Sequence, residues 1–299
     1  MIRSLLSLKI LTGWKGEPIE EMMNDIITNI GNSTLQHGKY NDRIYLMKLS
    51  RNDFPDIIDK LDTLAIEKGY SKIIAKVPEF ARDEFTKSGY FIEAFIPEFY
   101  DCNEDVYFMG KYFTESRLHS REYEKFREIL KLAALKTTEE RTAECIPGFN
   151  CRICDKSDVN QIAGVYKTVF ETYPFPIHEP QYIIKTMDEN FIYFSIWRNN
   201  KIVALSSSEM DARSQNVEMT DFATLPEHRG NGFAVYLLQE MEYEMRKRNM
   251  KIAYTIARSL SYGVNIIFAR MGYRYSGTLL NNTNIAGNLE SMNVWYKPL

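Results

Sequence analysis

The sequence predicts a mixed α/β (α+β) chain of 299 residues that is built from two related halves. Apolar runs typical of strands alternate with amphipathic stretches typical of helices. The order of these elements over residues 56–112 matches their order over residues 240–296, which indicates an internal repeat. A strand, a glycine loop and a long helix follow one another over residues 217–250. Each half is therefore expected to contain one mixed sheet covered by helices.

Length and composition support two folded units. We predict a first half-domain at residues 1–114, a helical connector at 115–147 and a catalytic domain at 148–299. The hydrophobic content of 44% favours folded cores, and the net charge of −3 gives no electrostatic case for binding nucleic acid or an anionic membrane. No apolar run reaches the roughly 20 residues of a membrane span. The apolar run at residues 5–11 lacks a cleavage site, so we expect a cytoplasmic protein.

The four cysteines do not indicate a metal site. Cys151 and Cys154 form the only CxxC pair, and the four histidines are scattered along the chain. A zinc site requires a second cysteine pair or nearby histidines. We therefore interpret this pair as part of a strand and expect no metal.

The N-terminal half contains a helix, a strand, a second helix and two further strands. Ile57 and Leu61 point inward from a helix at residues 56–68, which ends at Gly69. A strand follows at 72–77, a helix at 79–87, and strands at 91–100 and 106–112. Charged residues with a helical apolar rhythm then predict the connecting helix.

The C-terminal half begins with a strand near Phe149 and a helix at residues 157–170 with Ser157 as its N-cap. A loop with two prolines follows at 173–178, and a second helix runs over 180–188. Strands at 191–197 and 201–209 are joined at Asn199 and Asn200, which favour a hairpin turn.

The stretch at residues 217–250 has the features of an anion site. A strand ends at Thr224, a loop carries Gly230 and Gly232, and an amphipathic helix follows. The first N–H groups of a helix have no partner within the helix and attract phosphate. A turn that uses the two glycines for geometry alone is the alternative. The loop lacks the Gly-Lys-Ser/Thr ending of a P-loop and the three spaced glycines of a dinucleotide site.

This loop resembles the acetyl-CoA loop of the GNAT superfamily of N-acetyltransferases. The family pattern Gln/Arg-x-x-Gly-x-Gly/Ala is matched by Arg229, Gly232 and Ala234. The resemblance extends over residues 149–297 and implies a GNAT fold and acetyl-CoA as co-substrate. The residues that it implies for binding acetyl-CoA are Phe222, Ala223, Thr224, Arg229, Gly230, Asn231, Gly232, Phe233, Ala234, Asn265 and Phe268.

With this resemblance, the internal repeat identifies the N-terminal half as a degenerate GNAT-like half-domain. Its match to the second half includes residues 85–90 against 268–273, which both end in Gly-Tyr. Residues 51–55 stand where the glycine loop belongs and contain no glycine. We expect this half to pack, to bury surface or to support a homodimer, but not to bind CoA.

The C-terminal half is similar, more narrowly, to the β-lysine N-acetyltransferases. The likeness lies in residues 170–177, 254–260, 281–285 and 292–297. It implies a small-molecule acceptor and transfer of acetyl to the ε-amine of β-lysine. The product, N6-acetyl-β-lysine, is a neutral compatible solute of osmoadaptation in that family.

The reaction requires a base, because an amine with a pKa of about 10.4 is protonated at neutral pH. Glu218 and Asp221 lie on the strand before the loop, and on a regular strand they point to opposite faces. Only one of them then faces the acceptor unless a bulge intervenes. We favour Glu218 as the base, while Asp221 binds a substrate ammonium or makes an ion pair. A backbone N–H of residues 222–224 is expected to hold the oxyanion.

The proton donor for the departing thiolate is not settled by the sequence. Family members commonly place a tyrosine four residues before the later Gly-Tyr pair, and here that residue is Phe268. Tyr262, Tyr254 and Tyr273 are the alternatives, and Tyr262 is the one we include among the catalytic residues. Departure as a thiolate is the remaining possibility.

The acceptor is expected to contact the aromatic loop and several polar groups. Tyr173 and Phe175 would form the wall of the pocket, and Glu209 would add a carboxylate. Arg258 is placed to bind a substrate carboxylate, and Asn282 is placed to hydrogen-bond its polar groups. A surface arginine and a plain turn at residues 281–284 are the simpler alternatives.

Three functions are compatible with these observations. The first is acetylation of β-lysine or a similar diamino acid. The second is acetylation of a protein or peptide, which an open groove would favour. The third is acetyl-CoA sensing without catalysis, which the phenylalanine at position 268 would favour.

Overall fold

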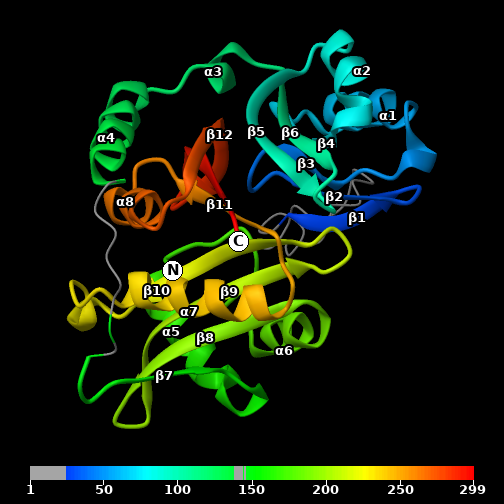
Figure 1. Cartoon of the computed structure of the whole chain (residues 1–299). Coiled ribbons are helices and arrows are strands. Elements are labelled where there is room, and N and C mark those ends of the chain that lie inside the picture. Colours follow the sequence, from blue (N-terminus) through cyan, green and yellow to red (C-terminus); the bar gives the residue numbers. More distant parts are fainter. Residues whose placement is uncertain (1–24, 138–143, 145) are drawn as a thin grey trace, which may run out of the picture.

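The computed structural model describes residues 25–137, 144 and 146–299 (Figure 1). The predictions for residues 5–11 and for part of the connector lie outside these residues. The boundaries that we assigned to the domains stay predictions.

The N-terminal half forms a six-stranded sheet in the order β1-β2-β3-β4-β6-β5. Apolar residues of α1 and α2 pack on one face of this sheet. Gly69 adopts a left-handed conformation with φ 61° and ends α1, as the sequence predicts. The elements are β1 (Ile26–Ile30), β2 (Ser33–Gly38), β3 (Arg43–Lys48), η2 (Arg51–Asp53), α1 (Ile57–Lys68), β4 (Lys72–Pro78), η3 (Glu79–Ala81), α2 (Arg82–Lys87), β5 (Phe91–Tyr100) and β6 (Glu104–Tyr112).

The connector and the C-terminal half follow. A seven-stranded sheet has the order β12-β13-β11-β10-β9-β8-β7. The elements are α3 (Glu115–Leu118), α4 (Tyr123–Lys136), β7 (Asn150–Ile153), η4 (Lys156–Asp158), α5 (Val159–Val169), α6 (Pro180–Glu189), β8 (Phe191–Arg198), β9 (Lys201–Asp211), β10 (Asn216–Thr224), η5 (Pro226–His228), α7 (Phe233–Lys247), β11 (Ile252–Arg258), α8 (Tyr262–Arg270), β12 (Arg274–Ile285) and β13 (Asn288–Pro298).

Two local predictions are wrong in detail. Ser157 does not cap the helix; Asp155 caps the preceding turn, and its side chain accepts from the Ser157 backbone N–H at 2.7 Å. The Asp158 side chain in turn accepts from the Asp155 backbone N–H, which completes a capping box. The connecting helix is also interrupted, with α3 and α4 as separate pieces.

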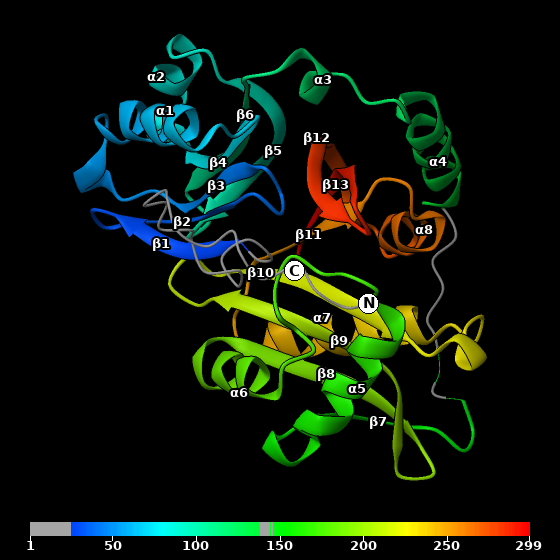
Figure 2. The ribbon, with the colours of Figure 1, turned by 180° about the vertical axis from the view of Figure 1, so that it is seen from behind.

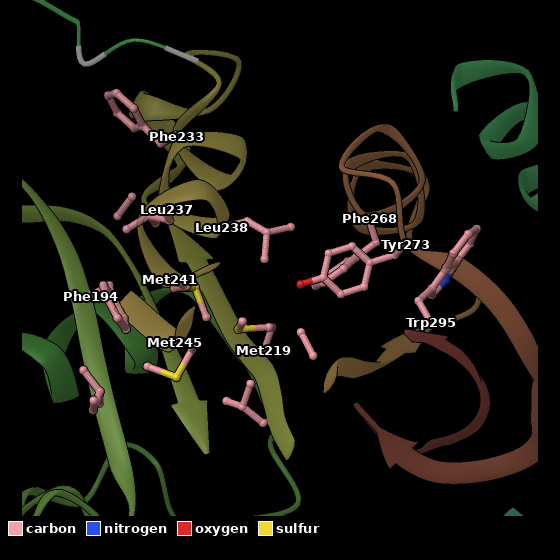
Figure 3. Packing of buried hydrophobic residues seen from close by; sticks show 14 of the residues in the cluster. Phe194, Met219, Phe233, Leu237, Leu238, Met241, Met245, Phe268, Tyr273 and Trp295 are labelled. Carbon is pink, nitrogen blue, oxygen red and sulfur yellow. The ribbon is translucent and has the colours of Figure 1, made fainter. Parts of the chain in front are cut away.

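The C-terminal sheet has different cover on its two faces. Leu237, Met241 and Met245 of α7 recur one turn apart and pack on one face together with Phe268 of α8 (Figure 3). Side chains of α5 and α6 pack on the opposite face of β8, β9 and the end of β10. The remaining part of that opposite face, on β11–β13, is covered by the N-terminal sheet.

The internal repeat is confirmed and extends further upstream than the sequence indicated. The order β1-β2-β3-β4-β6-β5 of the first sheet repeats as β8-β9-β10-β11-β13-β12 in the second. In both halves the glycine-loop position lies between two parallel strands, β3–β4 and β10–β11. The two sheets are thus copies of one topology.

The two halves share a core and a backbone contact. Phe108 of β6 and Val294 of β13 belong to the same buried cluster. β5 and β12 lie side by side in both views (Figure 2). A Cβ on Gly277 would lie 2.0 Å from the carbonyl oxygen of Glu93, so only glycine allows this approach. The Phe95 backbone N–H also donates to the Ser276 hydroxyl at 2.7 Å.

Candidate active site

The parallel strands β10 and β11 separate part-way along their length. Their ladder consists of three residue pairs and ends at Glu218 opposite Tyr254, whereas the β9–β10 ladder continues to Thr224. A bulge lies between Thr220 and Ala223, and within it Asp221 has a left-handed φ of 56°. The bulge breaks the regular alternation that would send Glu218 and Asp221 to opposite faces. The edge of β10 beyond Glu218 therefore has no ladder partner in β11.

The glycine loop is open and exposed at the start of α7. Gly230 and Gly232 have φ values of 83° and 75°, and a Cβ on either would meet no atom within 4 Å. No side chain caps the N-terminus of α7. Arg229 and Asn231 turn back onto the loop, with Nε of Arg229 3.4 Å from the Thr224 carbonyl and Nδ2 of Asn231 2.9 Å from the His228 carbonyl. Free space, glycines and helix N–H groups fit a diphosphate.

Several residues assigned to cofactor binding have side chains in the core. Ala223 and Phe233 are buried, and the Phe233 ring lies 4.8 Å from the ring of Phe149. The Phe222 ring meets the Phe268 ring edge-on at 5.7 Å. These side chains fix the strand and the helix, so any contact of residues 222–224 or 233 with a ligand would come chiefly from the backbone.

Glu218 lies on the face of the sheet that is directed toward the N-terminal half. Its neighbours Val217 and Met219 belong to the core under α7, so Glu218 points to the opposite side. The Tyr254 hydroxyl donates to its carboxylate. Burial, reinforced by the nearby Glu209 carboxylate, raises the pKa of Glu218 to about 8. A carboxyl in this range can accept a proton near neutral pH.

Glu209 lies opposite Glu218 in the β9–β10 ladder. Burial raises its pKa, and the positive charge of Lys76 acts in the other direction. Lys76 belongs to β4 of the N-terminal half, and its ammonium nitrogen is 5.9 Å from the centre of the Tyr254 ring. The carboxylate pair therefore has a cation of the other half nearby.

Asp221 connects the bulge to the loop at residues 173–178, which is expected to line the acceptor pocket and is called the acceptor loop below. Its carboxylate accepts from the hydroxyls of Tyr173, Ser207 and Thr220, with Ser207 at 2.5 Å and Thr220 at 3.2 Å. Burial raises the pKa of Asp221, while these hydroxyl donors oppose that shift. Three donors leave little capacity for a further ammonium, so the carboxylate is placed as an anchor. Phe175 packs with the same loop against the core under α5 and α6.

Two of the assigned cofactor residues need correction. Asn265 is fully buried and both of its polar atoms are used: Nδ2 donates to the carbonyls of Arg258 and Ser261, and Oδ1 accepts from Asn293 and Trp295. Phe268 is also fully buried, in the core under α7 and α8. Asn265 stabilises the joint between β11 and α8, and neither side chain is available to a ligand.

The residues proposed for the carboxylate of the acceptor and for the thiolate lie in different environments. Arg258 makes a two-pronged ion pair with Glu290, at 2.6 and 2.9 Å. Asn282 is buried in an irregular part of β12. Tyr262 begins α8 and is 40% exposed, whereas Tyr273 is buried against Phe268.

The sequence did not reveal that the N-terminal half reaches this site. Lys76 of β4 lowers the pKa of both Glu209 and Glu218, and the charges of these two carboxylates raise the pKa of Tyr45 of β3. Gln36 of β2 donates to the Pro174 carbonyl of the acceptor loop at 3.2 Å. The predicted strand at residues 72–77 contained Lys76, whereas β3 with Tyr45 was not predicted, and only the packing of one half on the other brings both residues to Glu218.

Comparison with known proteins decides the family. The sequence pattern of the "Acetyltransferase (GNAT) family" matches residues 160–273. A β-lysine N(6)-acetyltransferase of Methanococcus maripaludis is 45% identical over 271 residues, covering 91% of this chain and 98% of that protein. The chain belongs to the GNAT acetyltransferases. It is therefore an N-acetyltransferase, with the GNAT fold in the C-terminal half.

Two further likenesses accompany this one. A β-lysine N(6)-acetyltransferase of Methanosarcina mazei is 32% identical and covers 82% of this acetyltransferase and 98% of the relative. The crystal structure of the ribosomal-protein-S18-alanine N-acetyltransferase of Escherichia coli superposes with a TM-score of 0.45 at 13% identity, covering 50% of this chain and 93% of that one.

The described residues contain neither a metal-ligating cluster nor a helix that could span a membrane. Among the described residues, no group of three or more His, Cys, Asp or Glu is arranged to hold a metal ion. Burial raises the pKa of the Cys154 thiol to about 12. No helix in the described part of the chain has the length and apolar character of a membrane span.

Proposed function

We propose that this acetyltransferase transfers the acetyl group of acetyl-CoA to the ε-amine of β-lysine, giving N6-acetyl-β-lysine. The acceptor is proposed because the two full-length relatives described above carry this activity in their names. The observation in the structure that supports acetyl transfer is that the β10–β11 ladder ends at Glu218 and that the same strand leads into the open glycine loop. A neutral product of this kind suits a compatible solute.

The glycine loop and the separated strands are proposed to hold acetyl-CoA. Backbone N–H groups of residues 229–234 would bind the diphosphate at the start of α7. The edge of β10 at residues 222–224, which lacks a ladder partner in β11, would hydrogen-bond the remaining part of the co-substrate. When bound, acetyl-CoA supplies the activated acyl group. No metal enters the proposal.

Glu218 is proposed as the general base. The ammonium of the acceptor loses its proton to Glu218, directly or through a water, and the nitrogen then forms a bond to the thioester carbon. An N–H of residues 222–224 stabilises the oxyanion. The nitrogen then releases its second proton to water as the C–S bond breaks, and CoA departs through its sulfur. The Glu209 carboxylate lies beside Glu218 and raises the pKa of Glu218, which makes Glu218 a stronger base for removing a proton from the ammonium.

Tyr262 is proposed to give a proton to the departing sulfur. It is exposed at the first residue of α8, next to the end of β11. Tyr254 is the second candidate, because its hydroxyl is bound to Glu218 and so lies at the strand separation. A Tyr262→Phe variant that loses more rate than Tyr254→Phe would favour the first assignment.

The function is tested by identifying the product. The enzyme is incubated with acetyl-CoA and, separately, β-lysine, α-lysine, spermidine and a peptide library, and release of CoA is followed. Mass spectrometry with fragmentation then locates the acetyl group. We expect the highest kcat/KM with β-lysine and acetylation of the ε-nitrogen. Preferred turnover of the peptides, or of a polyamine, would contradict the proposal.

A further inference from the structure

A polar strip on the inward face of the C-terminal sheet separates two apolar clusters. One cluster lies under α5 and α6, and the other joins β11–β13 to the N-terminal sheet. Between them lie the polar side chains of β9–β11 described above. The N-terminal sheet covers one side of this strip and reaches the acceptor loop on the other, through the Gln36–Pro174 hydrogen bond of 3.2 Å. The strip is therefore bounded by both halves.

Arg43 of β3 is a buried cation without a carboxylate partner. It is 4% exposed, and no carboxylate in the described part of the chain lies within ion-pairing distance of its guanidinium. Its Nη1 donates to the Asn282 carbonyl at 2.7 Å, and its Nε–H has no partner. Burial lowers its pKa to about 10, although the charges of Asp25 and Glu93 act in the other direction. A buried arginine of this kind is costly unless an anion joins it.

Two buried amide oxygens beside Arg43 also lack partners. They are Oε1 of Gln36, whose side chain is 1% exposed, and Oδ1 of Asn282, whose side chain is 4% exposed. Gln36 pairs with Tyr45, and Gly38 pairs with Arg43, across β2 and β3. Gln36 and Arg43 are therefore diagonal neighbours on one face of that sheet. The two oxygens that lack a donor can accept hydrogen bonds from an ammonium, and the guanidinium can pair with a carboxylate, so the group is complementary to an amino acid.

Tyr45 connects this group to the catalytic carboxylates. The guanidinium carbon of Arg43 is 5.5 Å from the centre of the Tyr45 ring. Tyr45 also packs against the cluster that contains Tyr254. Burial raises the pKa of the Tyr45 hydroxyl, and the negative charge of Glu218 adds to that effect. The ring therefore lies near both the unpaired cation and the proposed base.

We propose that the N-terminal half, together with Asn282 of β12, binds the amino-acid end of the acceptor: Arg43 pairs with its carboxylate, and the side-chain oxygens of Gln36 and Asn282 accept from its β-ammonium. The methylene arm then lies along Tyr45 and presents the ε-amine to Glu218. The degenerate half thus determines which amine is acetylated. This inference rests on the proposed acceptor, β-lysine.

The test compares β-lysine with two analogues, one without the carboxylate and one without the β-amine. Arg43→Lys keeps a cation but loses the planar fork of donors. We expect kcat/KM with β-lysine to fall by about 30-fold or more, as for other buried charge pairs. The value with the analogue that lacks the carboxylate should change by less than about threefold, since no such pair is lost.

Gln36→Met provides a second variant, which tests recognition of the β-amine rather than of the carboxylate. It should lower kcat/KM with β-lysine by roughly tenfold, because a buried ammonium loses an acceptor. The change also removes the hydrogen bond from Gln36 to the Pro174 carbonyl, so kcat/KM with the analogue that lacks the β-amine should fall as well, but by less than about threefold.

Arg117→Lys is the matched control. Arg117 is a buried arginine of α3 in the connector that donates to the Asn41 carbonyl of the N-terminal half at 2.8 Å, but it has a carboxylate, Asp42, at 3.8 Å. This change should lower thermal stability without altering the ratio between substrates. If Arg43→Lys lowers turnover of β-lysine and of its decarboxylated analogue equally, Arg43 is only structural and the inference fails. If the wild type does not acetylate β-lysine, the proposed function fails instead.

Discussion

Glu218 combines a buried carboxyl with a hydroxyl donor. Desolvation raises its pKa to about 8, and the Tyr254 hydroxyl donates to it. At pH 7 most of this carboxyl is protonated, so the active base is the minor form. The rate with a saturable acceptor should therefore rise with pH until Glu218 is ionised.

The first prediction concerns this ionisation. In the wild type, kcat/KM should show a limb with an apparent pKa near 8. Glu218→Gln should lower kcat by about 100-fold or more and remove this limb, because general-base catalysis contributes roughly 10²–10⁴-fold. A variant that keeps both the rate and the limb would exclude Glu218 as the base.

The stability of Glu218→Gln provides its control. An unfolded glutamate loses its proton near pH 4.3, whereas folded Glu218 keeps it up to about pH 8. The folded state thus binds more protons between these values, and Glu218 lowers stability as pH rises through that window. Glu218→Gln should therefore unfold at an equal or higher temperature than the wild type at pH 8.5, so lost activity is not lost folding.

Asp221 leads to a different expectation, because its carboxylate holds Tyr173 of the acceptor loop. The second prediction is that Tyr173→Phe raises KM for the acceptor by roughly three- to tenfold, consistent with the loss of one hydrogen bond to a charged group, and leaves the limb near pH 8. Tyr193→Phe is the control: its hydroxyl bonds Thr186 at 2.8 Å in the same cluster. Equal effects of the two changes on KM would show that the loop is not involved.

At the scale of single elements, the sequence predicted most of the fold correctly. Apolar periodicity identified α1, α7 and the long strands, and the glycine spacing identified the loop between β10 and α7. It did not reveal the bulge at Asp221, because a left-handed aspartate has no signature in the pattern of strand residues. It also assigned Asn265 to cofactor binding. The hydrogen bond that Asn265 accepts from Asn293 of β13 arises from tertiary packing, which the sequence pattern does not show.

The glycine loop gives the third prediction. Gly232 has φ 75° at the N-cap of α7, where an alanine costs roughly 1–2 kcal/mol of strain. Gly232→Ala should raise the dissociation constant of CoA by about tenfold, equivalent to 1.4 kcal/mol, measured by calorimetry. Gly148→Ala is the control, because Gly148 has φ 85° and equally free space but lies outside the loop. Similar weakening by both changes would mean that global strain, not the loop, determines affinity.

At the scale of the whole molecule, the sequence predicted a repeat but not how the two copies pack on each other. The matched order of elements was visible because each copy keeps its own strands and helices. Contacts such as Arg43 with Asn282 join residues 239 positions apart. No periodicity encodes which face of one copy meets the other, so the N-terminal contribution to the site emerged only from the fold.

The shared cluster between the sheets gives the last prediction. Phe108 is fully buried there, together with residues of β11 and β13. Phe108→Ala should destabilise the protein by about 3–5 kcal/mol, because it leaves a cavity at the joint. Phe91→Ala on the neighbouring strand is the control, since Phe91 is 64% exposed and its loss should cost less than about 1 kcal/mol. Calorimetry of the wild type should show a single transition, because neither sheet can lose this partner without exposing the cluster. Two separate transitions, with Phe108→Ala lowering only the one assigned to the N-terminal half, would instead mean that the halves fold independently.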